Sequence, residues 1–372
     1  MWIAHNMRTG LVVALFASVG LMAACATEPR QTVAAHRVGA PTSASPTAKS
    51  ANELFSAGRR PVVTGWELEP ARLSAAYCAD CHADRHAEWA PGMHAKAWSD
   101  PLFLKAFARE PRRWCENCHA PLVAQHDDAV LRKQGINCAA CHVRDGTILG
   151  PRTRVAGDGA HTVCALPGFA EAALCEGCHQ FNFPASFDGG VRYSTRPMQD
   201  TLREWRAAAA ETCRSCHYRG HQLLGPHDTL WLEQLVRAAK IERVASDLLS
   251  LQIELAPRAH GLPTGDLFHS LTLELASDAT FAHVLARTRY GREFGPGFIS
   301  TFTISTRATL RDTTIPAQAK TLNVTFDDPG AVRLFARLRY FMYDPAVDHT
   351  SKPDPASATT LWAETYDLPP QH

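Results

Sequence analysis

A five-residue pattern, Cys-x-x-Cys-His, occurs five times between residues 78 and 217 of this 372-residue chain. The five copies read CADCH, CENCH, CAACH, CEGCH and CRSCH, and they hold ten of the twelve cysteines. Two thiols three residues apart lie across about one helical turn, at the separation of the two vinyl groups of a haem. The adjacent imidazole then points at the iron. The pattern therefore predicts covalent attachment of c-type haem.

A zinc site and an oxidised disulfide are the alternatives for a Cys-x-x-Cys pair. A zinc site combines one such pair with further ligands, but it gives no reason for a histidine to follow every pair. The Cys and His frequencies of this chain lead us to expect roughly 0.02 such motifs by chance, and five are present. We therefore predict five haems. Their thioether ligands are Cys78, Cys81, Cys115, Cys118, Cys138, Cys141, Cys175, Cys178, Cys213 and Cys216, and their first axial ligands are His82, His119, His142, His179 and His217.

Each iron can take a second histidine, and thirteen histidines lie outside the motifs. His94 opens a helix-like segment after the first motif, whereas His86 follows His82 too closely and is expected at the edge of its own haem. His161 lies in a Gly-rich loop before the fourth motif. His126, in AQHDD, is a weaker candidate.

Three further candidates follow the fifth motif. His221 and His227 come directly after it, and at least one of them is expected to bind iron. His227 is preferred because a Gly-Pro turn holds it and Asp228 follows it. His260 ends a strand-like segment, and as an iron ligand it would dock the C-terminal part of the chain onto a haem; its alternative role is that of a turn residue only. Cys164 is expected to be a free buried thiol, with an iron thiolate as the alternative.

The N-terminus has the features of an export signal. Arg8 precedes an apolar run from Leu11 to Ala24, which is short for a membrane span and typical of a signal-peptide core. The run ends in LMAAC, which resembles a bacterial lipoprotein box and predicts lipidation of Cys25; an ordinary secretory signal is the alternative. Ala26, in place of Asp, favours the outer membrane by resemblance to Gram-negative sorting. The formal net charge of +1 gives no indication of a nucleic-acid partner.

The chain divides by composition into five parts. We predict a signal peptide over 1–24, a flexible Ala/Ser/Pro-rich tether over 25–60, a pentahaem domain over 61–238, a β-sandwich-like domain over 245–345 and a loose tail over 346–372. The pentahaem domain is expected to consist of short helices and loops wrapped on haems, and a helix-like stretch, TLWLEQLVRAAKIERVA, closes it. Six segments of alternating character predict the strands of an all-β sandwich: LLSLQIELA, SLTLELAS, AHVLARTRY, FISTFTIST, KTLNVTF and VRLFARLRYFMY.

The stretch YCADCHADRHAEWAPGMHAKAW resembles the opening of multihaem cytochromes c related to the tetrahaem electron acceptor of hydroxylamine oxidoreductase. Trp89, His94 and Ala95 match that pattern, whereas His86 replaces its aromatic residue. WCENCHAPL and LCEGCHQFNFP resemble later haem segments of exported multihaem cytochromes, and AHGLPTGD resembles the β-domain that often follows them. The resemblance implies electron transfer and names no particular partner.

Three functions follow from these expectations. The first is an electron carrier without catalytic residues, located in the periplasm or at the outer membrane and exchanging electrons with other cytochromes or a quinol-oxidising complex. The second is a reductase of nitrite, hydroxylamine or another small oxyanion, which needs one haem with an open coordination position. Reductases of nitrite with many haems typically carry a Cys-x-x-Cys-Lys site, which this chain lacks. The third is a subunit of an extracellular cytochrome filament.

Overall fold

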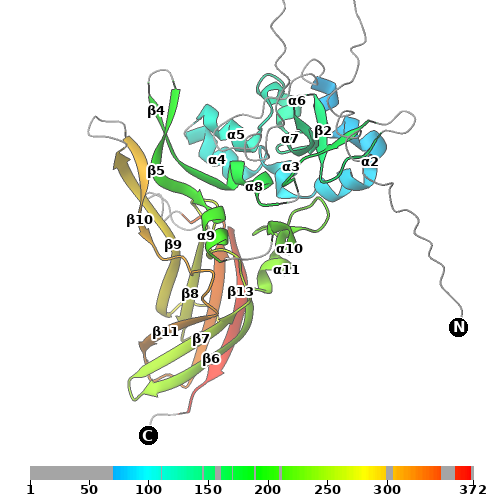
Figure 1. The fold of residues 1–372 in the computed structure, drawn as a ribbon. Helices are drawn as coiled ribbons and strands as arrows, with labels where there is room; N and C mark the ends of the chain where they lie inside the picture. The colour runs from blue at the N-terminus through cyan, green and yellow to red at the C-terminus, as the bar shows by residue number, and fades with distance from the viewer. Residues whose placement is uncertain are drawn as a thin grey trace, which may run out of the picture.

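The computed structural model has a helical part and a β-rich part, drawn at the top and bottom of Figure 1. It describes residues 70–109, 111–144, 146–155, 161–169, 171–187, 190–208, 212–298, 305–344 and 357–369. The predicted signal peptide, the tether and Cys25 lie outside the described residues. The predicted order, a helical part followed by a β-rich part, agrees with the structure at this level of detail.

The helical part consists of short helices, with none longer than α2 among the described residues. They are η1 (Pro70–Leu73), α2 (Ala75–Trp89), α3 (Met93–Lys96), α4 (Pro101–Arg109), η2 (Arg113–Cys115), α5 (Glu116–His119), η3 (Val123–His126), α6 (Ala129–Arg132), α7 (Cys138–His142), α8 (Ala173–His179), α9 (Thr201–Ala207), α10 (Cys213–His217) and α11 (Thr229–Glu233). None of the described helices is long and apolar enough to cross a membrane.

Two small sheets accompany these helices. β1 (Val143–Arg144), β2 (Thr147–Gly150) and β3 (Val163–Ala165) form a three-stranded sheet in that order. β4 (Gln180–Phe187) and β5 (Gly190–Asp200) form an antiparallel hairpin directly after α8, and this hairpin extends toward the β-rich part in Figure 1.

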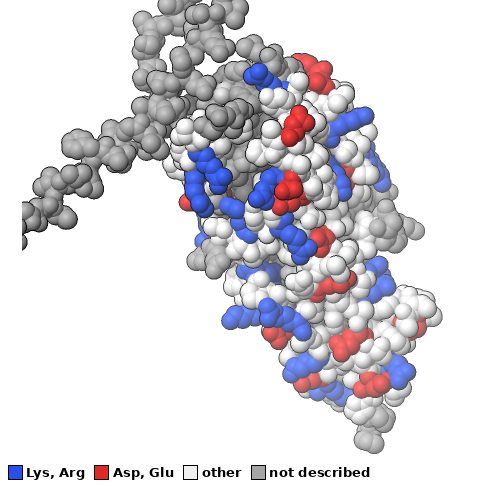
Figure 2. All heavy atoms as spheres, turned by 90° about the vertical axis from the view of Figure 1, so that its right-hand side faces the viewer, with Lys and Arg blue, Asp and Glu red and all other residues white. Residues whose placement is uncertain are grey.

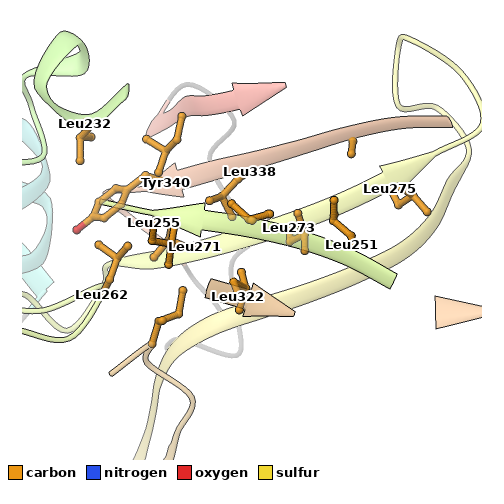
Figure 3. Packing of buried hydrophobic residues seen from close by; sticks show 14 of the residues in the cluster. Leu232, Leu251, Leu255, Leu262, Leu271, Leu273, Leu275, Leu322, Leu338 and Tyr340 are labelled. Carbon is orange, nitrogen blue, oxygen red and sulfur yellow. The ribbon is translucent and has the colours of Figure 1, made fainter. Parts of the chain in front are cut away.

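The β-rich part has two sheets that share one apolar core. β10 (Ser305–Asp312), β9 (Val284–Phe298), β8 (Ser270–Ala276), β12 (Arg333–Phe341) and β13 (Ala358–Asp367) are hydrogen-bonded in that order. β11 (Thr321–Asp327), β7 (Leu248–Leu255) and β6 (Val236–Ala245) form the second sheet. Leu251 of β7, Leu273 of β8 and Leu338 of β12 meet between the sheets, as Figure 3 shows, so the arrangement is a sandwich.

Two segments differ from the sequence-based expectation. The helix-like stretch 229–245 forms α11 and then the strand β6, because residues from 236 onward pair with β7, placing Ile241 opposite Leu251. Residues 358–367, predicted as part of a loose tail, form β13, which pairs with β12 and buries Leu361. In both cases tertiary pairing decided a conformation that local composition left ambiguous.

One glycine fixes the packing around α3. Gly135 has φ +58, and a Cβ at this position would lie 2.5 Å from the carbonyl oxygen of His94. The neighbouring Ile136 N donates to that same oxygen, at 2.8 Å, and the Ile136 carbonyl accepts from Trp89 Nε1 at 2.9 Å. The left-handed turn therefore ties α3, and with it His94, to the segment that precedes α7.

Charged side chains of both signs are distributed along the face seen in Figure 2. This agrees with the nearly neutral composition of the polypeptide. The face therefore presents no field of a single sign to a partner.

Candidate functional site

Each Cys-x-x-Cys-His motif lies on a helix that ends or kinks at its histidine. α5, α7, α8 and α10 end at His119, His142, His179 and His217. α2 continues past His82, but that residue departs from helical geometry, with φ −121 and ψ 43. The residues after His142, His179 and His217 are extended. At four motifs both thiols and the imidazole belong to one helix, whereas in the second motif Cys115 ends η2 and the rest of the motif forms α5. After His142, His179 and His217 the chain turns away directly.

Backbone carbonyls fix the tautomer of three motif histidines. Nδ1 of His119, His142 and His217 lies 2.6, 2.9 and 2.7 Å from the carbonyl oxygens of Ala97, Leu149 and Leu224, respectively. A carbonyl oxygen can only accept, so Nδ1 carries the proton and donates it. The lone pair is then on Nε2, and the hydrogen bond orients the ring, as in metal-ligating histidines.

Four motif histidines face a second histidine from elsewhere in the chain. The ring centroids of His82 and His161 are 5.9 Å apart, those of His179 and His94 6.4 Å, those of His142 and His221 6.3 Å, and those of His217 and His260 5.9 Å. A similar structure is known. It is a penta-haem cytochrome c552 from Thermochromatium tepidum, with a TM-score of 0.62 and 20% sequence identity.

The similarity to the cytochrome c552 covers 80% of this chain and all of that one. At this identity it shows a shared fold. No protein-family model and no curated protein sequence matches the chain.

The ring separations test whether a haem iron fits between each pair. Imidazole nitrogens bind metals at about 2.0 Å, so two rings on opposite sides of one metal have centroids roughly 6 Å apart. All four pairs lie at this separation. Two cysteines precede one histidine of every pair, at the spacing that haem attachment requires. The residues present therefore fit five c-type haems, four of them with a histidine on each side.

Burial favours the neutral, metal-binding form of the paired rings. Desolvation lowers the pKa of His94, His142 and His260, although backbone hydrogen bonds oppose this at the latter two. Desolvation also lowers the pKa of His179 to about 4, with further lowering by nearby histidines that include His94 and His217. A neutral imidazole is the form that coordinates a metal, so these rings need not lose a proton to bind iron.

The motifs adjoin one another in a continuous group. Thiols of different motifs lie close enough to shift one another's pKa: that of Cys138 is raised by Cys78, that of Cys118 by Cys178, and that of Cys175 by Cys213. The first motif therefore contacts the third, and the fourth contacts both the second and the fifth. Cys141 of the third motif acts electrostatically on Cys175 of the fourth, which completes the row.

The ten motif cysteines form no disulfides with one another. The described residues also contain no group of three or more His, Cys, Asp or Glu side chains that could hold a metal ion. Neither alternative use of Cys-x-x-Cys, as a disulfide or as a zinc site, therefore has support in this part of the chain. Cys164 is buried, as expected.

Two predicted second ligands are not brought opposite a motif histidine. His126 points its Nδ1 at Glu116 Oε2, 3.1 Å away. His227 is partly buried near Lys96, Asp100 and His269. Of the two histidines that follow the fifth motif, His221 and not the preferred His227 faces a motif histidine, and that histidine belongs to the third motif.

His221 reaches the third motif because the loop turns sharply at Gly220, which has φ +61. The glycine directly before His221 was the sequence signal that could have identified this histidine as a second ligand. The turn also brings His221 beside Glu88 of α2, a contact that sequence analysis missed. Glu88 lies six positions after His82 but 133 positions before His221. No spacing rule in the sequence links two residues so far apart.

His119 differs from the other motif histidines. Within the described residues its ring stacks on Phe103, with centroids 3.8 Å apart and planes 12° apart, and contacts no second histidine ring. Burial lowers the pKa of His119, while the hydrogen bond to Ala97 and the charges of Asp266 and Asp100 oppose the shift. Asp100 also acts on His227, so the two histidines share one neighbourhood.

Proposed function

We propose that this chain is an exported c-type cytochrome that carries five covalent haems and transfers electrons between redox proteins. The observation that carries the proposal is the set of four histidine pairs, each containing the histidine of a Cys-x-x-Cys-His motif. The similar fold of a penta-haem cytochrome supports it. Suitable partners are other cytochromes or a quinol-oxidising complex.

A bound haem supplies a one-electron iron couple, and the polypeptide supplies its environment. The cysteines of each motif would hold the group, and the paired imidazoles would be the ligands of its iron at four motifs. Backbone carbonyls at His119, His142 and His217 orient the rings. An iron with a histidine on each side would have no free coordination position for a substrate. Four such sites favour an electron carrier over a catalyst.

The test combines a haem count with low-temperature EPR of the oxidised holo-protein. The pyridine haemochrome assay and the intact mass should give five haems per chain. Low-spin ferric signals alone, unchanged by cyanide or nitrite, are the expected result for a carrier. A count below five, or free thiols in any motif, would contradict the proposed cofactor content.

A reductase is the second candidate, and the neighbourhood of His119 favours it. This motif histidine lacks a facing histidine ring among the described residues, and His227 and Lys96 lie near Asp100 on the same side of the fold. An open position with such proton donors is what reduction of nitrite or hydroxylamine requires.

A His227→Ala variant separates the two candidates. If His227 binds the second iron, the wild type is entirely low-spin and the variant gains one high-spin signal. If that iron has an open position, the wild type already shows a high-spin signal, and cyanide or nitrite converts it. His283→Ala is the matched control, because His283 is exposed beside Asp278 in the β-rich part and should change neither spectrum.

We also propose that Cys25 carries a lipid that anchors the chain to the outer membrane. Support comes from the apolar run 11–24 and the small residues before Cys25. Cells fed labelled palmitate should label the wild type and not a Cys25→Ala variant. Equal labelling of both proteins, or release of both to the soluble fraction, would contradict the anchor.

A further inference from the structure

The Nδ1 atom of His221 is hydrogen-bonded to a carboxylate. Glu88 Oε2 lies 3.0 Å from His221 Nδ1 and 3.1 Å from the His221 backbone nitrogen. The approach depends on Gly220, since a Cβ there would lie 2.5 Å from the same oxygen. Both donors of His221 therefore converge on one carboxylate oxygen of α2.

Arg85, one turn earlier on α2, holds the other side of this carboxylate. Its Nη1 donates to Glu88 Oε1 at 2.8 Å and to Oε2 at 3.1 Å. Hydrogen bonds from His221 and Arg85 keep the pKa of Glu88 below its usual range. Glu88 is therefore ionised at neutral pH, and Arg85 competes with His221 for its charge.

Other paired histidines, including His142 opposite His221, have a different hydrogen-bond partner. His142, His217 and His260 donate from Nδ1 to the backbone carbonyls of Leu149, Leu224 and Gly261. A carboxylate carries a full negative charge, and a carbonyl carries only a dipole. An imidazole that donates to a carboxylate is the more basic metal ligand. Such a ligand stabilises ferric over ferrous iron and lowers the reduction potential.

We propose that Glu88 acts through His221 to lower the reduction potential of the haem bound by the third motif, and that Arg85 limits the effect. The inference rests on the proposed function, because it needs a haem between His142 and His221. Glu88 is then a positioning residue that couples two sites: it belongs to the helix of the first motif and acts on the third. An electron on the third haem would be held less tightly with Glu88 than without it.

Two substitutions with opposite expected effects test this inference. Glu88→Gln keeps an acceptor oxygen for Nδ1 but removes the charge, so one midpoint potential should rise. Arg85→Gln frees the carboxylate to act more strongly on His221, so the same midpoint should fall. Asp84→Asn is the matched control: Asp84 is exposed on the same helix and acts on Arg85 more weakly than Glu88 does, so its loss removes one negative charge but not the carboxylate beside His221.

The measurement is a potentiometric titration of the five-haem protein followed by EPR and visible absorption. We expect Glu88→Gln to weaken the preference for ferric iron about tenfold, which for one electron corresponds to ~59 mV. The four other midpoints should stay in place. Loss of structure alone cannot move one midpoint in opposite directions in two variants, and Arg85→Gln remains informative if Glu88→Gln does not fold.

The outcomes separate this inference from the proposed function. If the wild type lacks five haems or His221→Ala leaves all low-spin signals unchanged, the haem assignment fails and the tuning role fails with it. If five haems are present and His221→Ala opens one of them, the assignment holds. Glu88 then has no tuning role if its Gln variant moves no midpoint, or if Asp84→Asn moves the same midpoint equally.

Discussion

The two parts of this molecule are held together by different means. The β-rich part has one cluster of sixteen buried apolar residues, which spans both sheets and closes on α11. The helical part has only small clusters, of six residues around Leu122 and four around Phe169. Hydrophobic burial stabilises a fold roughly in proportion to the apolar area removed from water. The β-rich part therefore has a polypeptide core, whereas the helical part depends on what its cysteines and histidines bind.

The largest expected effect follows from preventing haem attachment. Chain produced without its export signal should remain haem-free, and its motif helices should unfold because they are too short to be stable alone. The sandwich should keep its fold. Hydrogen exchange with mass spectrometry should show fast exchange over α5, α7, α8 and α10 and slow exchange over β7, β8 and β12. Equal protection of the helical and β-rich parts from hydrogen exchange would show that the helical part is stable without haem and would contradict this prediction.

A substitution in the sandwich should produce the reverse pattern. Leu338 of β12 is fully buried between the sheets, and Leu338→Ala should lower the free energy of unfolding of the β-rich part by about 2–5 kcal/mol. Denaturant unfolding followed by far-ultraviolet circular dichroism measures this loss, and the haem count should stay unchanged. Leu285→Ala is the control, because Leu285 of β9 is 43% exposed and its loss should cost little.

A smaller effect is expected where the two parts meet. Glu204 of α9 accepts hydrogen bonds through Oε2 from Gly261 N at 3.0 Å and from Thr264 Oγ1 at 2.8 Å. Glu204→Ala removes both hydrogen bonds and should weaken the association of the helical part with the β-rich part by roughly 2 kcal/mol. Unfolding followed at the Soret band and by far-ultraviolet circular dichroism should then separate into two transitions. Glu233→Ala, at the exposed end of α11, should leave them as in the wild type.

The same contrast explains what the sequence could predict. Cys-x-x-Cys-His acts within one helical turn, so the motifs and their helices follow from local spacing. The alternation of apolar residues in β7, β8, β11 and β12 is likewise local, and these strands were predicted. β6 and β13 were not, because their conformation comes from pairing with a neighbouring strand.

The facing histidines were the least certain part of the prediction. His94, His161 and His260 were named as second ligands, and the structure brings each close to a motif histidine. His221 was passed over for His227, six residues away. Which of two loop histidines turns inward depends on Gly220 and on the distant Glu88, and a single histidine carries no periodic signal.

His260 also has a consequence for the order in which the molecule is completed. All five motifs precede it in the chain, and it reaches His217 only from the loop between β7 and β8. During synthesis, which begins at the N-terminus, the fifth motif emerges before its partner does. A chain that ends before His260 therefore has His217 without its facing histidine. The presence of this pair distinguishes a complete molecule from an unfinished one.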